Sequence, residues 1–338
     1  MQTVNLSTYF SGMATMYFIM LAAYVFVQPS RTRFQSVLGW TFVVWAVMNF
    51  KDIILSFPEL YTRQVLNYIM VVDGWTGILY TIFILELTAP GWTTWRKIAL
   101  LSIPWALFTV AYVVWPTDSV LYAYVAFLWC YAWSIVVIAF VKVRRYLRYI
   151  RTNYSNIDDI DISWLKYVFL FFIVGQLAWL ATSLAGSALI DVVYYVVIIL
   201  MWQVTLYYSW NVRPITIEPL PAEPQPAERG YAFADELERL LMDKQLYLNP
   251  NLTLNDLAAL VHTNRTYVSS YFNSVKGKPF YDYINQLRIE QKSLPLMEEH
   301  PEFKLEYIAA ESGFQSISTF RRAFHKLKGM SPSQYRQQ

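Results

Sequence analysis

The fold of the C-terminal part of the chain is decided by two stretches, LTLNDLAALVHTNRTYVSSYFNSVKGKPFYDYINQLRIEQ (Leu252–Gln291) and IAAESGFQSISTFRRAFHKLKGMSPSQYR (Ile308–Arg336). In the first, Thr253-Leu254-Asn255-Asp256 has the form of a capping box, which starts a helix. Apolar residues then recur at helical spacing and predict one helix over 254–261 and a second over 265–276. Two short helices joined by a short turn are typical of a helix-turn-helix unit.

The second stretch repeats this pattern. Its apolar residues predict a helix over 304–312, Gly313 is the expected left-handed terminator, and a further helix is predicted over 316–328. Neither stretch contains the alternating residues that would indicate strands, so the predicted fold class is all-α. Two helix-turn-helix units in close succession indicate a protein that places recognition helices in the major groove of DNA.

These residues resemble the C-terminal DNA-binding domain of the AraC/XylS transcription regulators, from Leu252 to Arg336. The most specific matches are Gly313-Phe314, Ser318 to Phe324 and the motif SPSQYR that starts at Ser331. The resemblance implies a bacterial transcription factor that is not an enzyme, with two helix-turn-helix units joined by a long helix. Its expected partners are double-stranded promoter DNA, a second copy of the chain and RNA polymerase. In one departure from the family pattern, Lys292 and Pro295 interrupt the connecting helix and predict a kink or an early stop.

The candidate DNA-binding residues lie near the start of each predicted recognition helix, where side chains reach base edges and phosphates. In the first unit the expected exposed residues are Asn264, Arg265, Thr266, Ser269 and Ser270, whereas Val268, Phe272 and Val275 are expected to point inward. In the second unit the family resemblance implies DNA contact for Gln315, Ser316, Ser318, Thr319 and Arg322, with Arg321 near the backbone. After Glu311 the chain has five basic residues and no acidic one. A solvated helix surface is the alternative interpretation.

The N-terminal part of the chain has a different composition. All 13 Trp residues precede residue 212, whereas 15 of the 27 Lys and Arg and 15 of the 24 Asp and Glu follow it. A membrane-spanning helix needs roughly 20 mostly apolar residues. Seven segments qualify: Thr8–Val27, Phe34–Phe57, Gln64–Thr88, Lys97–Trp115, Ser119–Val141, Trp164–Leu184 and Ala188–Trp210. Six spans are the alternative, because Lys51 and Asp52 interrupt the second segment and only small residues around Gly186 separate the last two.

Basic residues predict the orientation of these spans. Nine Lys and Arg residues follow the first, third and fifth segments, and two lie on the opposite side. Because basic loops stay in the cytoplasm, we expect a multi-pass protein of the bacterial cytoplasmic membrane, with its N-terminus outside and its C-terminal domain in the cytoplasm. The run Arg144, Arg145, Arg148 and Arg151 follows one helical face and is expected to meet anionic lipid headgroups.

Three domains are therefore predicted. Residues 1–212 form a polytopic transmembrane bundle, 213–230 a linker and 231–338 the DNA-binding domain. The linker prediction depends on five prolines within thirteen positions, which prevent helix continuation and favour an extended spacer.

Ionisable residues inside the predicted spans are the candidates for sensing. A charge in the bilayer is costly and usually faces a partner or a cavity, so Asp73 in the third span is expected to pair with Lys51 of the second. Such a pair is either structural or part of a ligand site. Glu86 and Asp191 lie near span ends, where interfacial solvation is expected. Lone Cys130 excludes an intrachain disulfide or a cysteine zinc site, and we expect no cofactor and no metal.

Our leading hypothesis is a membrane-integrated one-component transcription regulator, with the bundle sensing a small-molecule or membrane signal. Two alternatives stay open. The bundle is a transporter or membrane enzyme with an attached regulatory DNA-binding domain, or it acts only as an anchor.

Overall fold

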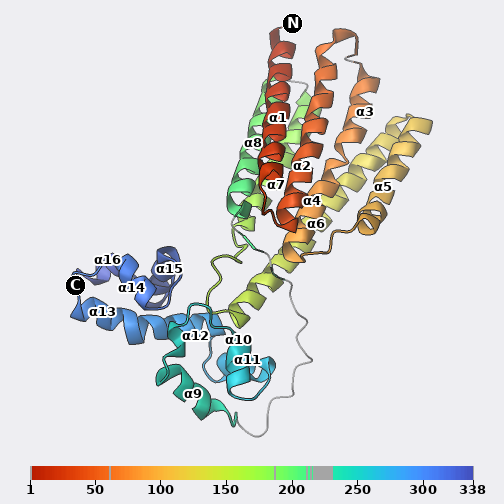
Figure 1. The fold of residues 1–338 in the computed structure, drawn as a ribbon. Helices are drawn as coiled ribbons and strands as arrows, with labels where there is room; N and C mark the ends of the chain where they lie inside the picture. The colour runs from red at the N-terminus through yellow and green to blue at the C-terminus, as the bar shows by residue number, and fades with distance from the viewer. Residues whose placement is uncertain are drawn as a thin grey trace. The chain divides into compact units, whose positions relative to one another are not determined.

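The computed structural model describes residues 2–60, 62–185, 188–210, 212–213, 215 and 231–337. The predicted all-α fold class is confirmed: within these ranges the regular elements are helices, with one isolated β-bridge between Tyr154 and Thr253. The chain divides into two compact units (Figure 1). The first comprises Met1–Arg144 and Ile162–Thr216, and the second comprises Arg145–Asp161 and Ile217–Gln338.

The first unit is a bundle of helices. Its elements are α1 (Gln2–Val27), α2 (Arg33–Phe50), α3 (Arg63–Asp73), α4 (Thr76–Thr88), α5 (Trp95–Val114), most of α6 (Asp118–Asn153), α7 (Leu165–Ala185) and α8 (Ala188–Trp210). Helix α1 packs against α2 and α8, and α7 packs against α8, as Figure 1 shows. The turn around Gly186 lies outside the described residues.

Several of these helices are long and apolar enough to cross a membrane. Among the described residues these are Thr8–Val27, Arg63–Thr88, Trp95–Val114, Asp118–Asn153 and Leu189–Trp210. Along α5 the large apolar side chains of Leu100, Leu107 and Val110 are exposed. An extended apolar surface of this kind is typical of a face that contacts lipid or another protein.

Two predicted spans differ from the helices observed. The second ends as an α-helix at Phe50 and continues as a 3₁₀ helix over Lys51–Ser56, which begins at the charged pair noted in the sequence. The third is divided into α3 and α4 around Gly74. A Cβ at Gly74 would collide with the Tyr124 hydroxyl, so this close approach requires glycine. The number of spans, six or seven, stays a prediction.

The second unit contains the predicted helix-turn-helix pairs. Its elements are the end of α6, α9 (Ala234–Met242), the 3₁₀ helix η3 (Leu246–Leu248), α10 (Leu254–Leu260), α11 (Arg265–Ser274), α12 (Phe280–Leu287), the π-helix η4 (Arg288–Ser293), α13 (Leu294–Glu299), α14 (Leu305–Glu311), α15 (Ile317–Lys328) and α16 (Pro332–Tyr335). The predicted linker lies outside the described residues except for positions 213 and 215.

Two apolar cores hold this unit, and the connecting helix belongs to both. Val268 of α11 and Ile284 of α12 are buried in the first core. Ile289 of η4 and Phe320 of α15 are buried in the second. The predicted early stop is wrong: the chain passes from α12 through η4 into α13. Pro295 cannot donate a backbone hydrogen bond, and the wider π-turn directly before it accommodates the loss within a continuing helix.

Candidate DNA-binding surface

The first helix-turn-helix unit is formed by α10 and α11. The predicted capping box is confirmed: Thr253 Oγ1 accepts from the Asp256 N–H at 3.2 Å, and the Asp256 carboxylate accepts from the Thr253 N–H at 2.8 Å. Asn264 is the N-cap of α11, where its Oδ1 accepts from the Tyr267 N–H at 3.0 Å. The capping role fixes the Asn264 side chain at the start of the helix, and the residue is exposed there.

The exposure of α11 follows the predicted pattern only in part. Val268 and Phe272 are fully buried as expected, and Ser269 and Ser270 are half-buried. The prediction that Thr266 is exposed is wrong, because its side chain is buried. Thr266 lies in the first turn of α11, where burial depends on neighbouring segments and not only on the helical period. The prediction that Val275 points inward is also wrong, because α11 ends at Ser274 and the helical period ends with it.

The second helix-turn-helix unit is formed by α14 and α15. Gly313 has a φ of 83°, which confirms the predicted left-handed terminator, and a Cβ there would overlap the Leu248 carbonyl. Ser316 is the N-cap of α15 and accepts from the Thr319 N–H at 3.2 Å. The turn between the helices is therefore fixed at both ends by local chemistry.

Residues of α15 separate into an inner and an outer face. Phe320 and Phe324 are buried, Ile317 packs against the second core, and Ser318 and Arg321 are exposed. Thr319, for which the family resemblance implies DNA contact, is 1% exposed, and its hydroxyl donates to Asp158, a residue far away in the sequence.

The other polar candidates of this unit also have protein partners. Gln315 is exposed and its Nε2 donates to Asn251 Oδ1 at 2.8 Å. Arg322 lies 3.5 Å from Asp158 and 3.9 Å from Asp161. Sequence reasoning did not identify these two carboxylates. The cluster of three acids at 158–161, soon after the basic run that ends at Arg151, was the signal that could have identified them.

The basic C-terminal residues are partly paired within the domain. Lys326 Nζ lies 2.7 Å from the Asp282 carboxylate, whereas Arg321 is 3.8 Å from Glu306 with both side chains more than half exposed. An exposed pair of this length contributes little to stability. Arg321 is therefore available to a phosphate at small cost.

Helix α9 is fixed to the first helix-turn-helix unit and to α12 through Glu238. Its carboxylate accepts from the Tyr271 hydroxyl at 3.0 Å and the Tyr283 hydroxyl at 3.1 Å, and it lies 2.9 Å from Lys276 Nζ. Burial, together with the adjacent Glu238 charge, raises the pKa of Tyr271 to about 12. Both tyrosines stay neutral donors at physiological pH, so this cluster is structural.

The polar residues of the bundle form a network that contains the predicted pair. Lys51 Nζ lies 2.7 Å from the Asp73 carboxylate and also pairs with Asp52, which accepts from the Tyr195 hydroxyl at 3.0 Å. The prediction of interfacial solvation for Glu86 is wrong. It is fully buried and accepts from Arg33 Nε at 2.8 Å, because the chain after α4 folds back and also supplies the N–H groups of residues 91 and 93.

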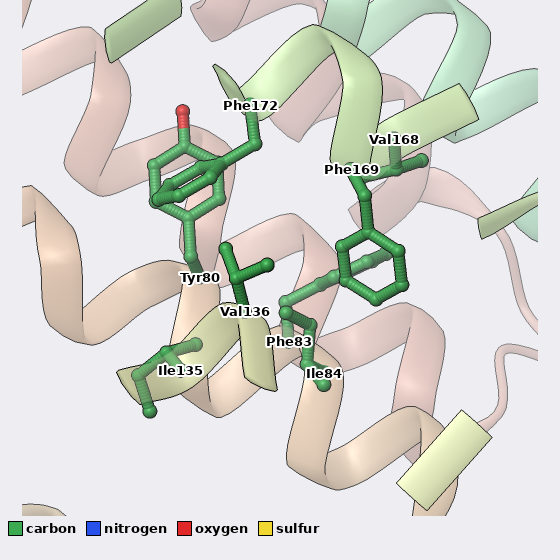
Figure 2. Close-up of a pocket in the computed structure, with 8 residues that line it drawn as sticks. All are labelled: Tyr80, Phe83, Ile84, Ile135, Val136, Val168, Phe169 and Phe172. Atoms are coloured by element: carbon green, nitrogen blue, oxygen red, sulfur yellow. The ribbon is translucent and has the colours of Figure 1, made fainter. Parts of the chain in front are cut away.

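The bundle also contains a small apolar pocket between α4, α6 and α7. It is lined by Tyr80, Phe83, Ile84, Ile135, Val136, Val168, Phe169 and Phe172. Figure 2 shows the Phe172 ring beside the Tyr80 ring, and their centroids are 4.8 Å apart. This lining suits an apolar group and lacks a charged side chain.

Two helix-turn-helix units on one connecting helix define a DNA-binding class, and comparison with known proteins gives the family of this part of the chain. The helix-turn-helix domain family matches residues 257–338, and this C-terminal part is an AraC-type domain. Over 90 residues the chain is 38% identical to the uncharacterized HTH-type transcriptional regulator YobQ of Bacillus subtilis (strain 168), covering 27% of this chain and 36% of that protein. Over 87 residues it is 33% identical to the uncharacterized HTH-type transcriptional regulator YtdP of the same strain, covering 26% and 11%.

A third similar protein is an uncharacterized HTH-type transcriptional regulator of Staphylococcus aureus (strain COL), 29% identical over 92 residues, with 27% of this chain and 12% of that protein covered. The aligned residues therefore make up about a quarter of this chain and about a third or less of the length of each relative.

Proposed function

We propose that this protein is a membrane-integrated transcription regulator that binds promoter DNA through α11 and α15. The observation that carries the proposal is the pair of helix-turn-helix units on one connecting helix, together with the family match of residues 257–338. In the first helix-turn-helix unit, the recognition helix α11 presents Arg265, Ser269 and Ser270. In the second helix-turn-helix unit, the recognition helix α15 presents Ser318, Arg321 and Arg322. These are the residue types that contact bases and phosphates.

The membrane part of the proposal is supported by the apolar helices and by their exposed apolar side chains. The N-terminus outside, the DNA-binding domain in the cytoplasm, a homodimer and contact with RNA polymerase are parts of the same proposal. They are drawn from the distribution of basic residues and from the family resemblance.

DNA binding is tested with the full chain in lipid nanodiscs and a pool of random duplexes. We expect repeated selection to enrich a sequence, and Arg321→Ala to weaken binding to it and to lower the salt dependence by about one phosphate contact. Arg239→Ala is the matched control. It removes the same charge from a similarly exposed arginine on α9, which lies outside both helix-turn-helix units. Failure to enrich any duplex, or equal effects of the two substitutions, would refute the assignment.

Sensing by the bundle is favoured over a simple anchor by the network around Lys51, Asp52 and Asp73. A passive anchor has no need of buried charges that cost free energy in a bilayer. We expect a chain whose residues 1–141 are replaced by an unrelated anchor of the same orientation to lose signal-dependent transcription. Unchanged regulation by that chimera would show that residues 1–141 only anchor the domain.

A further inference from the structure

One segment of the DNA-binding unit comes from the membrane half of the sequence. We call Arg145–Asp161, the end of α6 and the stretch after it, the α6 tail. Its Tyr154 forms an antiparallel bridge with Thr253, and the Ser155 N–H donates to the Leu252 carbonyl at 3.1 Å. Ser155 and Ile157 are buried. The tail is therefore packed into the DNA-binding unit by its own backbone, not merely connected to it.

Arg288 anchors the tail to the connecting helix. Its guanidinium is 1% exposed and donates to Ser155 O at 3.0 Å, Ser155 Oγ at 3.2 Å, Tyr247 O at 2.7 Å, Asn249 O at 2.8 Å and Asn285 Oδ1 at 3.2 Å. Burial lowers the pKa of Arg288 to about 10, and the group is still charged at neutral pH. Two of these five hydrogen bonds are accepted by Ser155 of the tail. The buried Arg288 charge therefore depends on the tail for part of the hydrogen bonding that replaces water.

The end of the tail lies on the second recognition helix. Asp158 accepts from the Thr319 hydroxyl and lies 3.5 Å from Arg322, while Asp161 lies 3.9 Å from the same guanidinium. Both carboxylates are less than one-fifth exposed, whereas the Arg322 side chain is 61% exposed. Carboxylate and phosphate oxygens are interchangeable acceptors for a guanidinium. The two acids therefore engage a guanidinium that the proposed function assigns to DNA.

The same tail also reaches the first recognition helix. Arg265 Nη1 donates to the Tyr149 hydroxyl at 3.3 Å, and its guanidinium carbon is 5.6 Å from the Tyr149 ring centroid. Two of the three arginines assigned to DNA contact at these helices, Arg265 and Arg322, are thus engaged by one segment. The opposite face of the α6 end carries the exposed residues Arg145, Arg148 and Arg151.

We propose that the α6 tail is an autoinhibitory clamp, which holds the DNA-binding domain at Ser155 and covers Arg322 and Thr319 with Asp158 and Asp161. This proposal rests on the proposed DNA-binding function. DNA binding requires the acidic end of the tail to leave α15, so the clamped fraction of the protein lowers the apparent affinity in proportion. Helix α6 contributes residues to both units, and the signal acts by changing the clamped fraction.

The clamp is tested by the affinity of the full chain in nanodiscs for a fluorescent duplex recovered from the enriched pool. We expect Asp158→Asn to tighten binding by about tenfold, since the amide keeps the shape of the side chain but loses the charge that pairs with Arg322. Asp159→Asn is the matched control, because it removes the same charge from the adjacent, exposed residue and should leave the affinity nearly unchanged. Equal affinities of the native chain and Asp158→Asn, or equal gains from the two variants, would overturn the clamp.

Docking of the tail is tested separately by a cross-link. Because the Ser155 N–H donates to Leu252 O, Tyr154 and Thr253 form a non-hydrogen-bonded pair with Cα atoms about 4.5 Å apart, within reach of a disulfide. We expect Tyr154→Cys with Thr253→Cys, in a Cys130→Ser background, to oxidise to an intrachain disulfide in the membrane-embedded chain. Absence of the cross-link would overturn the docked arrangement. A recovered duplex that binds every variant alike refutes the clamp alone, whereas no recovered duplex refutes DNA binding as well.

Discussion

Replacement of Arg288 by alanine tests the junction on which the DNA-binding unit depends. The change removes a guanidinium that is 1% exposed and leaves the carbonyls of Tyr247, Asn249 and Ser155 without this donor. A buried polar group left unsatisfied costs about 1–3 kcal/mol. The removed desolvation penalty of the charge offsets part of that loss, so we expect a net destabilisation of about 3 kcal/mol, at the lower end of the range for breaking a buried charge network.

Hydrogen exchange measured by mass spectrometry suits this prediction, because all 13 Trp residues lie before residue 212 and their emission does not report on this unit. At about 1.4 kcal/mol per factor of ten, exchange of the α12 to α13 amides should accelerate by roughly a hundredfold. Arg239→Ala, an exposed arginine on α9, is the control and should leave these amides within about a factor of two. Native-like protection in Arg288→Ala would refute the view that the guanidinium holds the junction together.

Three further predictions concern local features of the fold. Gly313→Ala should destabilise the second helix-turn-helix unit by about 2 kcal/mol or more, since the left-handed conformation and the overlap with the Leu248 carbonyl both oppose a Cβ. Faster hydrogen exchange of the α14 amides checks this prediction, and an exchange rate equal to that of the native chain refutes it. Thr253→Ala should cost about 1 kcal/mol through loss of the cap, which exchange in α10 measures; equal protection in the variant would contradict the capping role. Glu86→Gln should lower the thermal stability of the bundle, followed by Trp emission in nanodiscs, because its buried carboxylate accepts from Arg33 and two backbone N–H groups; an unchanged midpoint argues against that network.

Local chemistry explains what the sequence could predict. The Thr253 capping box, the Gly313 terminator and the inward positions of Val268 and Phe272 depend on residues within one helix or turn. The Lys51 to Asp73 pair was also predictable, because a charge inside a span needs a counter-charge and few are available. Each of these inferences uses a rule that needs no knowledge of how distant segments meet.

Long-range packing explains what the sequence could not predict. Thr319 is a candidate for DNA contact on α15, and Asp158, 161 positions earlier in the chain, accepts a hydrogen bond from its buried hydroxyl. Glu86 lies near the end of a span, but the chain that follows α4 returns and encloses its carboxylate. In both cases a side chain is buried by a segment whose position cannot be obtained from the periodicity of the helix that carries it. The site residues themselves stay predictions.

The prolines after Arg213 suggested that one linker alone connects the two halves, and the predicted boundaries at 213 and 230 stay untested. The structure adds a second connection, since Arg145–Asp161 belongs to the DNA-binding unit and precedes α7. Arg288 follows α12, which belongs to the first core, and Ile289 beside it belongs to the second. A displacement of Ser155 therefore removes hydrogen bonds at the residue where the two helix-turn-helix units meet. For this reason the α6 tail is better placed than a proline spacer to change how both recognition helices are presented to DNA.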